Sequence, residues 1–199
     1  MAIVVVSGSG RGAGKTVLVC GLIAALPEFA WVAVKVTTHA HSVLARIYEE
    51  PVAENSCAQG FDAGQQTDTA RYLAAGAWRA FLVSALDSEL DKRLSELRGL
   101  VGLEANLLFE SNRVLRHVQP DVCLAIEADA DAPRKPSFTL VERVKQATVR
   151  RAGFGAGDKV PGGAEPVFEL TDFASIPESM QQWLRARLLP GARPEECLG

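Results

Sequence analysis

Short apolar runs alternate with longer segments of mixed polarity along this chain of 199 residues. The runs are rich in Val, Leu, Ala and Phe, and their length and composition are typical of buried β-strands. Strands are predicted at Ala2–Val6, Trp31–Val36, Arg79–Ser84, Ala105–Phe109, Asp121–Ile126 and Val167–Leu170.

Helices are predicted between these runs. The clearest pattern lies in Ser88–Leu100, where Leu90, Leu94 and Leu97 share one helical face and charged residues occupy the others. The expected helices are Thr16–Leu26, Asp68–Ala75, Ser88–Leu100, Ser111–Val118, Phe138–Ala147 and Ile176–Leu188.

Apolar strands that alternate with helices are typical of a parallel sheet covered on both faces. The pattern therefore predicts an α/β fold of three layers with a mostly parallel central sheet, as a single domain over residues 1–199. In such sheets, ligands bind at the carboxyl ends of the strands, so the residues that follow each strand are the first candidates for chemistry.

A glycine-rich segment that ends in Gly14-Lys15-Thr16 joins the first predicted strand to the first helix. Loop N–H groups and the helix N-terminus both favour a bound phosphate, a lysine here reaches the β- and γ-phosphates, and the threonine binds Mg²⁺. Ser9 stands where the usual motif has its first glycine. The segment predicts a P-loop NTPase domain that binds ATP or GTP with Mg²⁺. The nucleotide-binding residues expected are Gly10, Arg11, Gly12, Ala13, Gly14, Lys15, Thr16 and Val17.

The composition limits the possible binding partners and the cellular compartment of the protein. The chain is 48% apolar, as globular proteins are, and its net charge of −3 gives no basic excess for a nucleic acid. Four scattered cysteines without a C-x-x-C pair favour reduced thiols and a cytoplasmic location. No apolar stretch has the length of a signal peptide or a membrane span, so no membrane association is expected.

Polar residues follow the second predicted strand. Lys35 lies within an otherwise apolar run, and its burial requires an anion, either a phosphate of the nucleotide or a carboxylate of the core. Thr37 and Thr38 could contact phosphate or the metal's water shell, whereas His39 and His41 are a weak metal-binding pair without further ligands.

Glu110 ends the fourth predicted strand. It could hold the Mg²⁺ water shell or orient an attacking group, or it could cap the next helix with Ser111. The metal role, shared with Thr16, is favoured because the phosphate loop lies at the same sheet edge. Weaker candidates for substrate or metal contact are Asp62, Asp68, Glu127, Asp129 and Asp131, and candidate anion clamps are Arg46, Arg71 and Arg113.

Two connections are long for a domain of this size. Residues 37–66 follow the carboxyl end of a strand and are interpreted as a substrate or switch loop. Residues 150–165 are glycine-rich and polar, and are interpreted as a flexible loop.

The run Lys35-Val36-Thr37-Thr38-His39-Ala40-His41, together with Gly14-Lys15-Thr16, resembles the molybdopterin-guanine dinucleotide biosynthesis protein B family. The segment Thr67–Ala77 and Glu110 are similar to that family as well, although Ser111-Asn112 stands where the family usually has Gly-Phe or Gly-Tyr. The family is similar in fold to dethiobiotin synthetase. The resemblance implies that Lys15, Thr16, Lys35 and Glu110 contact phosphate and Mg²⁺.

Three functions remain open. In the first, an enzyme of cofactor or small-molecule metabolism hydrolyses or transfers the γ-phosphoryl group, with Lys15, Lys35 and Glu110 as catalytic residues. In the second, implied by the resemblance, a GTP-binding accessory protein for molybdenum cofactor maturation regulates a partner enzyme. The third is a degenerate loop on a structural domain, against which the intact Gly14-Lys15-Thr16 argues. The second substrate or protein partner is unidentified, and a homodimer is left open.

Overall fold

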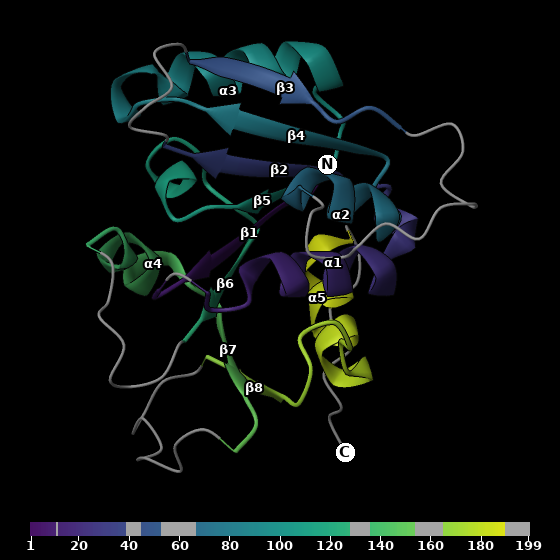
Figure 1. Ribbon diagram of the computed structural model, residues 1–199. Coiled ribbons are helices and arrows are strands. Elements are labelled where there is room, and N and C mark those ends of the chain that lie inside the picture. The colour runs from purple at the N-terminus through teal and green to yellow at the C-terminus, as the bar shows by residue number, and fades with distance from the viewer. Residues whose placement is uncertain (11, 39–44, 53–66, 128–135, 154–164, 190–199) are drawn as a thin grey trace.

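The computed structural model describes residues 1–10, 12–38, 45–52, 67–127, 136–153 and 165–189. Within them, eight strands form one sheet with helices packed on both of its faces (Figure 1). The strands are β1 (Ile3–Gly8), β2 (Val32–Thr37), β3 (Arg46–Glu49), β4 (Arg79–Ser84), β5 (Leu107–Glu110), β6 (Val122–Ile126), β7 (Ala147–Arg151) and β8 (Val167–Leu170). The helices are α1 (Lys15–Ala25), α2 (Asp68–Ala74), α3 (Asp87–Val101), α4 (Phe138–Val144) and α5 (Glu178–Leu188), with 3₁₀ turns η1 (Pro27–Phe29) and η2 (Arg113–Arg116).

The strands follow the order β3-β4-β2-β5-β1-β6-β7-β8. Every neighbouring pair is parallel except β3 and β4, which are antiparallel. The predicted α/β fold with a mostly parallel sheet is therefore confirmed. The chain starts in the middle of the sheet, where β1 lies between β5 and β6, and ligands of such sheets bind at the carboxyl end of this switch point.

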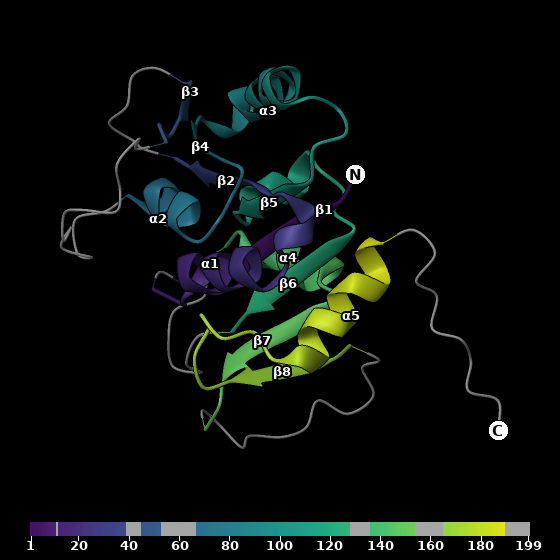
Figure 2. The same cartoon turned by 90° about the vertical axis from the view of Figure 1, so that its right-hand side faces the viewer.

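Alternate residues of the strands build two hydrophobic cores. Val4 and Val6 of β1 face the layer of α1, α2 and α5, whereas Val5 faces the layer of α3, η2 and α4. Figure 2 looks onto the first of these layers, with α4 behind the sheet. Burial on both faces explains why the central strands are apolar at nearly every position.

The sequence-based prediction missed two strands. β3 lies within the 37–66 connection. This short edge strand is largely exposed, so its sequence lacks the apolar run that marks a buried strand. β7 begins at Ala147, where the predicted helix Phe138–Ala147 was expected to end, and it takes up the first two residues of the 150–165 connection. The helix ends earlier because Lys145 adopts an extended conformation after Val144.

Helix boundaries otherwise differ from the prediction by a few residues, except that Ser111–Val118 contains only the 3₁₀ turn η2. Among the described residues, no helix is long and apolar enough to span a bilayer, and the longest, α3, has 15 residues.

Candidate functional site

The loop between β1 and α1 has the backbone conformation that its glycines predict. Gly12 and Gly14 have positive φ angles of 76° and 90°, which L-residues with a side chain rarely adopt. Gly14 is the residue before α1, and its carbonyl accepts the first bond of the helix from Leu18 N at 3.0 Å. The first turn of α1, whose N–H groups have no acceptor within the helix, therefore begins directly after the loop that follows β1.

Ser9 fits this loop without a glycine because its φ angle is not positive. The residue is buried, and its backbone N–H donates to Ile126 O of β6 at 3.0 Å. The departure from the usual motif thus falls at a position where the backbone conformation permits a side chain.

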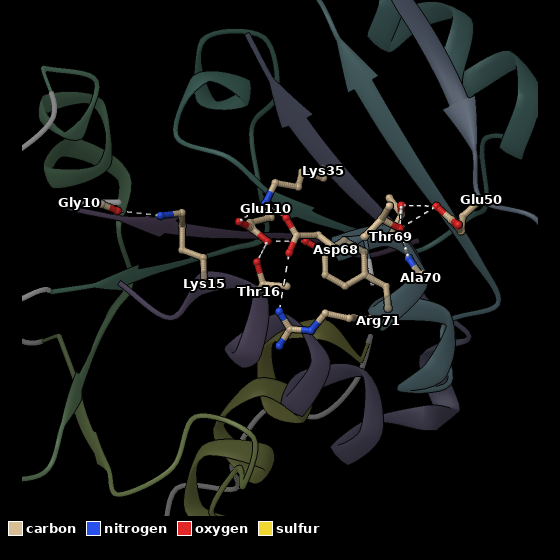
Figure 3. A network of polar contacts seen from close by, with 12 residues as sticks. Gly10, Lys15, Thr16, Lys35, Glu50, Asp68, Thr69, Ala70, Arg71 and Glu110 are labelled. Carbon is tan, nitrogen blue, oxygen red and sulfur yellow. Dashed lines mark hydrogen bonds and ion pairs between the residues drawn. The ribbon is translucent and has the colours of Figure 1, made fainter. Parts of the chain in front are cut away.

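Lys15 is the first residue of α1, and its side chain folds back over the loop. Its Nζ donates to Gly10 O at 3.0 Å (Figure 3). The ammonium therefore lies at the loop, where the sequence-based prediction places the phosphates. Arg11, another predicted nucleotide contact, lies outside the described residues.

Thr16, Lys35 and Glu110 meet beside this loop (Figure 3). Thr16 Oγ1 donates to Glu110 Oε2 at 2.8 Å, and Lys35 Nζ donates to Glu110 Oε1 at 3.0 Å. Lys35 and Glu110 are paired residues on the neighbouring strands β2 and β5, so the strand register brings their side chains together. Glu110 is only 5% exposed, and its carboxylate depends on these donors to offset the cost of burial.

Three residues of α2 complete the network. Asp68 forms an ion pair with Lys35 and lies 3.7 Å from Arg71, and the buried Tyr72 hydroxyl donates to Glu110 Oε2. Thr67 caps α2 by accepting a bond from Ala70 N at 3.1 Å, which fixes Asp68 in the first turn. Lys35 therefore lies between two carboxylates, which is the second of the two environments considered for it.

The network shifts the pKa values of its members. Burial alone would lower the pKa of Lys35, but the carboxylates of Glu110 and Asp68 outweigh it and raise this pKa above its usual value. Burial raises the pKa of Tyr72 well above the usual value, and the charge of Glu110 raises it further. Lys35 is thus firmly protonated, and Tyr72 is a neutral hydrogen-bond donor.

The donor set beside the loop fits Mg²⁺. Thr16 gives its proton to Glu110, so the lone pairs of its oxygen remain for a cation. The charges of Lys35 and Arg71 balance those of Asp68 and Glu110. Within the described residues, no group of three or more His, Cys, Asp and Glu side chains could hold a metal alone.

A cavity of about 880 Å³ opens over these residues. It is lined by the loop and first turn of α1, by the end of β2 and by the residues that follow β5. Its size is within the range of small-molecule sites. The lining comprises Gly12, Ala13, Gly14, Lys15, Thr16, Val17, Lys35, Val36, Thr37, Thr38, Arg71, Glu110, Ser111, Asn112, Arg113 and Ser137.

The other predicted candidates separate into three groups. Arg71 and Arg113 line the cavity, and Arg113 is also held by Asp87 and by Ala85 O, whereas Arg46 lies on the exposed edge strand β3. Glu127 follows β6 and is absent from the cavity lining. The remaining candidates lie outside the described residues: His39, His41, Asp62, Asp129 and Asp131.

Three residues of the site were missed by sequence reasoning. Tyr72 follows Asp68 at helical spacing, and Asn112 follows Glu110 at strand spacing, so both share a face with a candidate. Phe173, between β8 and α5, packs so closely on the loop that a Cβ on Gly14 would lie 2.3 Å from its ring. No local pattern indicates this last contact, because the two residues meet only in the folded chain.

Comparison with known proteins gives structural neighbours only. No family model matches the chain, and no curated protein matches its sequence. Among solved structures, the chain is similar to "apo" form LpxK from Aquifex aeolicus in complex with ATP, with 15% identity and a TM-score of 0.49. It is also similar to a MobB protein homolog from Bacillus stearothermophilus (18%, TM-score 0.45) and to Bacillus subtilis MobB (16%, TM-score 0.45).

These matches cover most of this chain but differ in how much of the neighbour they include. The match to LpxK covers 90% of this chain and 60% of LpxK. The match to the Bacillus stearothermophilus homolog covers 92% of this chain and 95% of the homolog, and the match to Bacillus subtilis MobB covers 98% of this chain and 100% of that protein. The chain therefore spans less than two thirds of LpxK and nearly the whole of both MobB chains. Two of these three solved structures are named MobB, the family that the sequence motifs resemble.

Proposed function

We propose that this protein binds a nucleoside triphosphate with Mg²⁺ at the carboxyl end of β1 and hydrolyses it or transfers its γ-phosphoryl group. The observation that carries the proposal is the bond from Thr16 to Glu110 beside a loop whose last glycine, Gly14, directly precedes α1. The loop that would bind the phosphates and the Thr16 hydroxyl that would bind Mg²⁺ line the same cavity, which supports the proposal.

Each residue of the site has a separate proposed role. The loop N–H groups and Lys15 would hold the phosphate oxygens, with Lys15 exchanging Gly10 O for a charged acceptor. Thr16 would hold Mg²⁺, which when bound neutralises charge on the β- and γ-phosphates. Both oxygens of Glu110 already accept hydrogen bonds, so its proposed role is to orient Thr16 and Lys35. Positioning then accounts for most of the catalysis, as in other phosphoryl transfers.

A regulatory GTP-binding role is the second candidate. Thr37 and Thr38 line the cavity and open the 37–66 connection, so a bound nucleotide would contact the start of that segment. A partner enzyme could then sense the nucleotide through residues 37–66. In this role the protein acts in molybdenum cofactor maturation, as the sequence resemblance implies.

Thermal unfolding with ATP or GTP, each with and without Mg²⁺, tests the proposal. A nucleotide that binds the native state raises the melting temperature in a concentration-dependent manner. We expect a shift with at least one nucleotide, larger when Mg²⁺ is present, and no shift with either nucleotide would refute both candidate functions. Tight binding with background turnover across a panel of small-molecule acceptors would favour the regulatory role.

A further inference from the structure

Two asparagines flank β5: Asn112 binds the last residue of β1, and Asn106 binds the residue that precedes β1. Asn106 precedes the strand and accepts a bond from Ala2 N at 2.7 Å, at the end of the sheet away from the loop. Asn112 follows the strand and lies at the phosphate loop. Gly8 N donates to its Oδ1 at 3.0 Å, and its Nδ2 donates to Gly8 O at 3.0 Å.

The Asn112 amide binds the backbone of β1 just beyond the point where backbone hydrogen bonding between β1 and the β5 segment ends. The last backbone bond between the two strands runs from Ser111 N to Val6 O at 3.2 Å. Beyond it, Asn112 satisfies both backbone groups of Gly8 with a single side chain. Asn112 also donates to Ser137 Oγ at 3.3 Å, so both of its amide hydrogens can be engaged. The residue is buried, and these three bonds fix the orientation of its amide.

Gly8 in turn supports Lys15. A Cβ placed on Gly8 would lie 3.2 Å from Cγ, Cδ and Nζ of Lys15, so the lysine side chain runs directly across this glycine. The path of the lysine from α1 back to Gly10 therefore depends on where the Gly8 backbone lies. A displaced Gly8 would move the surface on which Lys15 rests.

We propose that Asn112 is a positioning residue of the phosphate loop, which holds Gly8 so that Lys15 reaches the β- and γ-phosphates. The proposal rests on the function proposed above and adds a residue to that site. Asn112 acts through Gly8 and Lys15, and it need not touch the nucleotide.

Asn106 provides a matched control. It flanks the same strand, and its side chain also makes two backbone bonds, accepting from Ala2 N and donating to Phe29 O, both at 2.7 Å. Asn106→Ala should therefore cost stability as Asn112→Ala does, without changing the loop. The dissociation constants of Mg·ATP, Mg·GTP and Mg·tripolyphosphate are measured by calorimetry below the melting temperature of every variant.

We expect Asn112→Ala to weaken every ligand that binds the wild type by at least about tenfold, and Asn106→Ala to stay within about twofold. Tripolyphosphate carries no base or sugar, so its loss of affinity reports on the phosphate loop alone. If the wild type binds none of the three ligands, the proposed function is wrong. If the wild type binds and Asn112→Ala binds equally well, or if both variants lose affinity equally, the role of Asn112 is wrong.

Hydrogen exchange keeps the proposal testable if Asn112→Ala fails to fold. In the wild type, the Gly8 amide should exchange slowly because Asn112 accepts its proton. Fast exchange at Gly8 in the folded wild type would overturn the proposal. Asn112→Ser, whose shorter hydroxyl cannot span both backbone groups of Gly8, should speed this exchange, whereas Asn106→Ala should leave it unchanged.

Discussion

The Thr16 hydroxyl donates a 2.8 Å hydrogen bond to Glu110 Oε2 and so joins the first turn of α1 to the carboxyl end of β5. Because the hydroxyl proton points to Glu110, the lone pairs of the oxygen face other directions and can bind a cation. The second carboxylate oxygen accepts a bond from Lys35, which prevents Glu110 from turning away. Glu110 therefore orients the hydroxyl that is proposed to hold Mg²⁺.

Glu110→Gln tests this relationship because it keeps the size of the side chain and removes its charge. In the presence of Mg²⁺, we expect the affinity of the variant for nucleotide to be lower than that of the wild type by about tenfold or more. It should equal the affinity of the wild type after Mg²⁺ has been chelated. Affinity without Mg²⁺ should change little. Calorimetry with and without a chelator measures both values.

The exposed Glu104 offers a control for the loss of one negative charge. Glu104→Gln should keep the nucleotide affinity and the Mg²⁺ dependence of the wild type. Full Mg²⁺ dependence in Glu110→Gln would show that Glu110 does not orient the metal-binding hydroxyl.

Lys15→Ala should abolish the rise in melting temperature that nucleotides cause. The substitution removes the ammonium that lies at Gly10 O and is proposed to reach the phosphates. Lys92→Ala, on the exposed surface of α3, removes the same charge away from the site and should retain the full shift. An undiminished shift in Lys15→Ala would place the nucleotide elsewhere.

The central strands could be predicted because both of their faces are buried, which makes their apolar runs nearly continuous. Strand β3 could not be found in this way, since an exposed edge strand has no such run. β7 has buried residues at Ala147 and Val149, but its start coincides with the end of a helical pattern. Periodicity alone does not separate two elements that meet so closely.

The candidate site was partly predictable for a different reason. Lys35 lies near the carboxyl end of β2 and Glu110 ends β5, and the carboxyl ends of neighbouring parallel strands share one edge. The ion pair of Lys35 with Asp68, and the contact of Phe173 with the loop, depend on segments that are distant in sequence. No local pattern encodes such contacts, so the structure was needed to find them.

Gly14 and Gly12 provide a matched pair in the phosphate loop. Both have positive φ angles, but a Cβ on Gly14 would lie 2.3 Å from the Phe173 ring, whereas nothing lies within 4 Å of one on Gly12. Gly12→Ala should cost about 1–2 kcal/mol of unfolding free energy through backbone strain. Gly14→Ala should cost about 1–3 kcal/mol more, because the ring must move.

Urea unfolding without nucleotide measures these costs. In the double variant Gly14→Ala/Phe173→Ala the new methyl group has room, so the combined cost should be smaller than the sum of the single costs. Equal costs at Gly12 and Gly14, or additive costs in the double variant, would show that Phe173 does not constrain the loop.

Stability at alkaline pH should depend on Tyr72 and Lys35. The pKa values of both groups are higher in the folded protein than in the unfolded chain, for Tyr72 through burial and then the charge of Glu110, and for Lys35 because Glu110 and Asp68 outweigh burial. Above about pH 10 the folded state therefore holds more protons than the unfolded state. Their contribution to the unfolding free energy is complete below that pH and is lost as the pH rises further.

Tyr72→Phe isolates the contribution of the tyrosine. At neutral pH the variant should lose about 1.5–3 kcal/mol of unfolding free energy, because Glu110 loses a hydrogen-bond donor. Above about pH 10 its stability should fall less steeply than that of the wild type, since the variant lacks one of the groups whose pKa is raised in the folded protein. The exposed Tyr48 is the control, and Tyr48→Phe should follow the wild-type curve in urea unfolding. Parallel alkaline declines in Tyr72→Phe and the wild type would show that Tyr72 is not the group responsible.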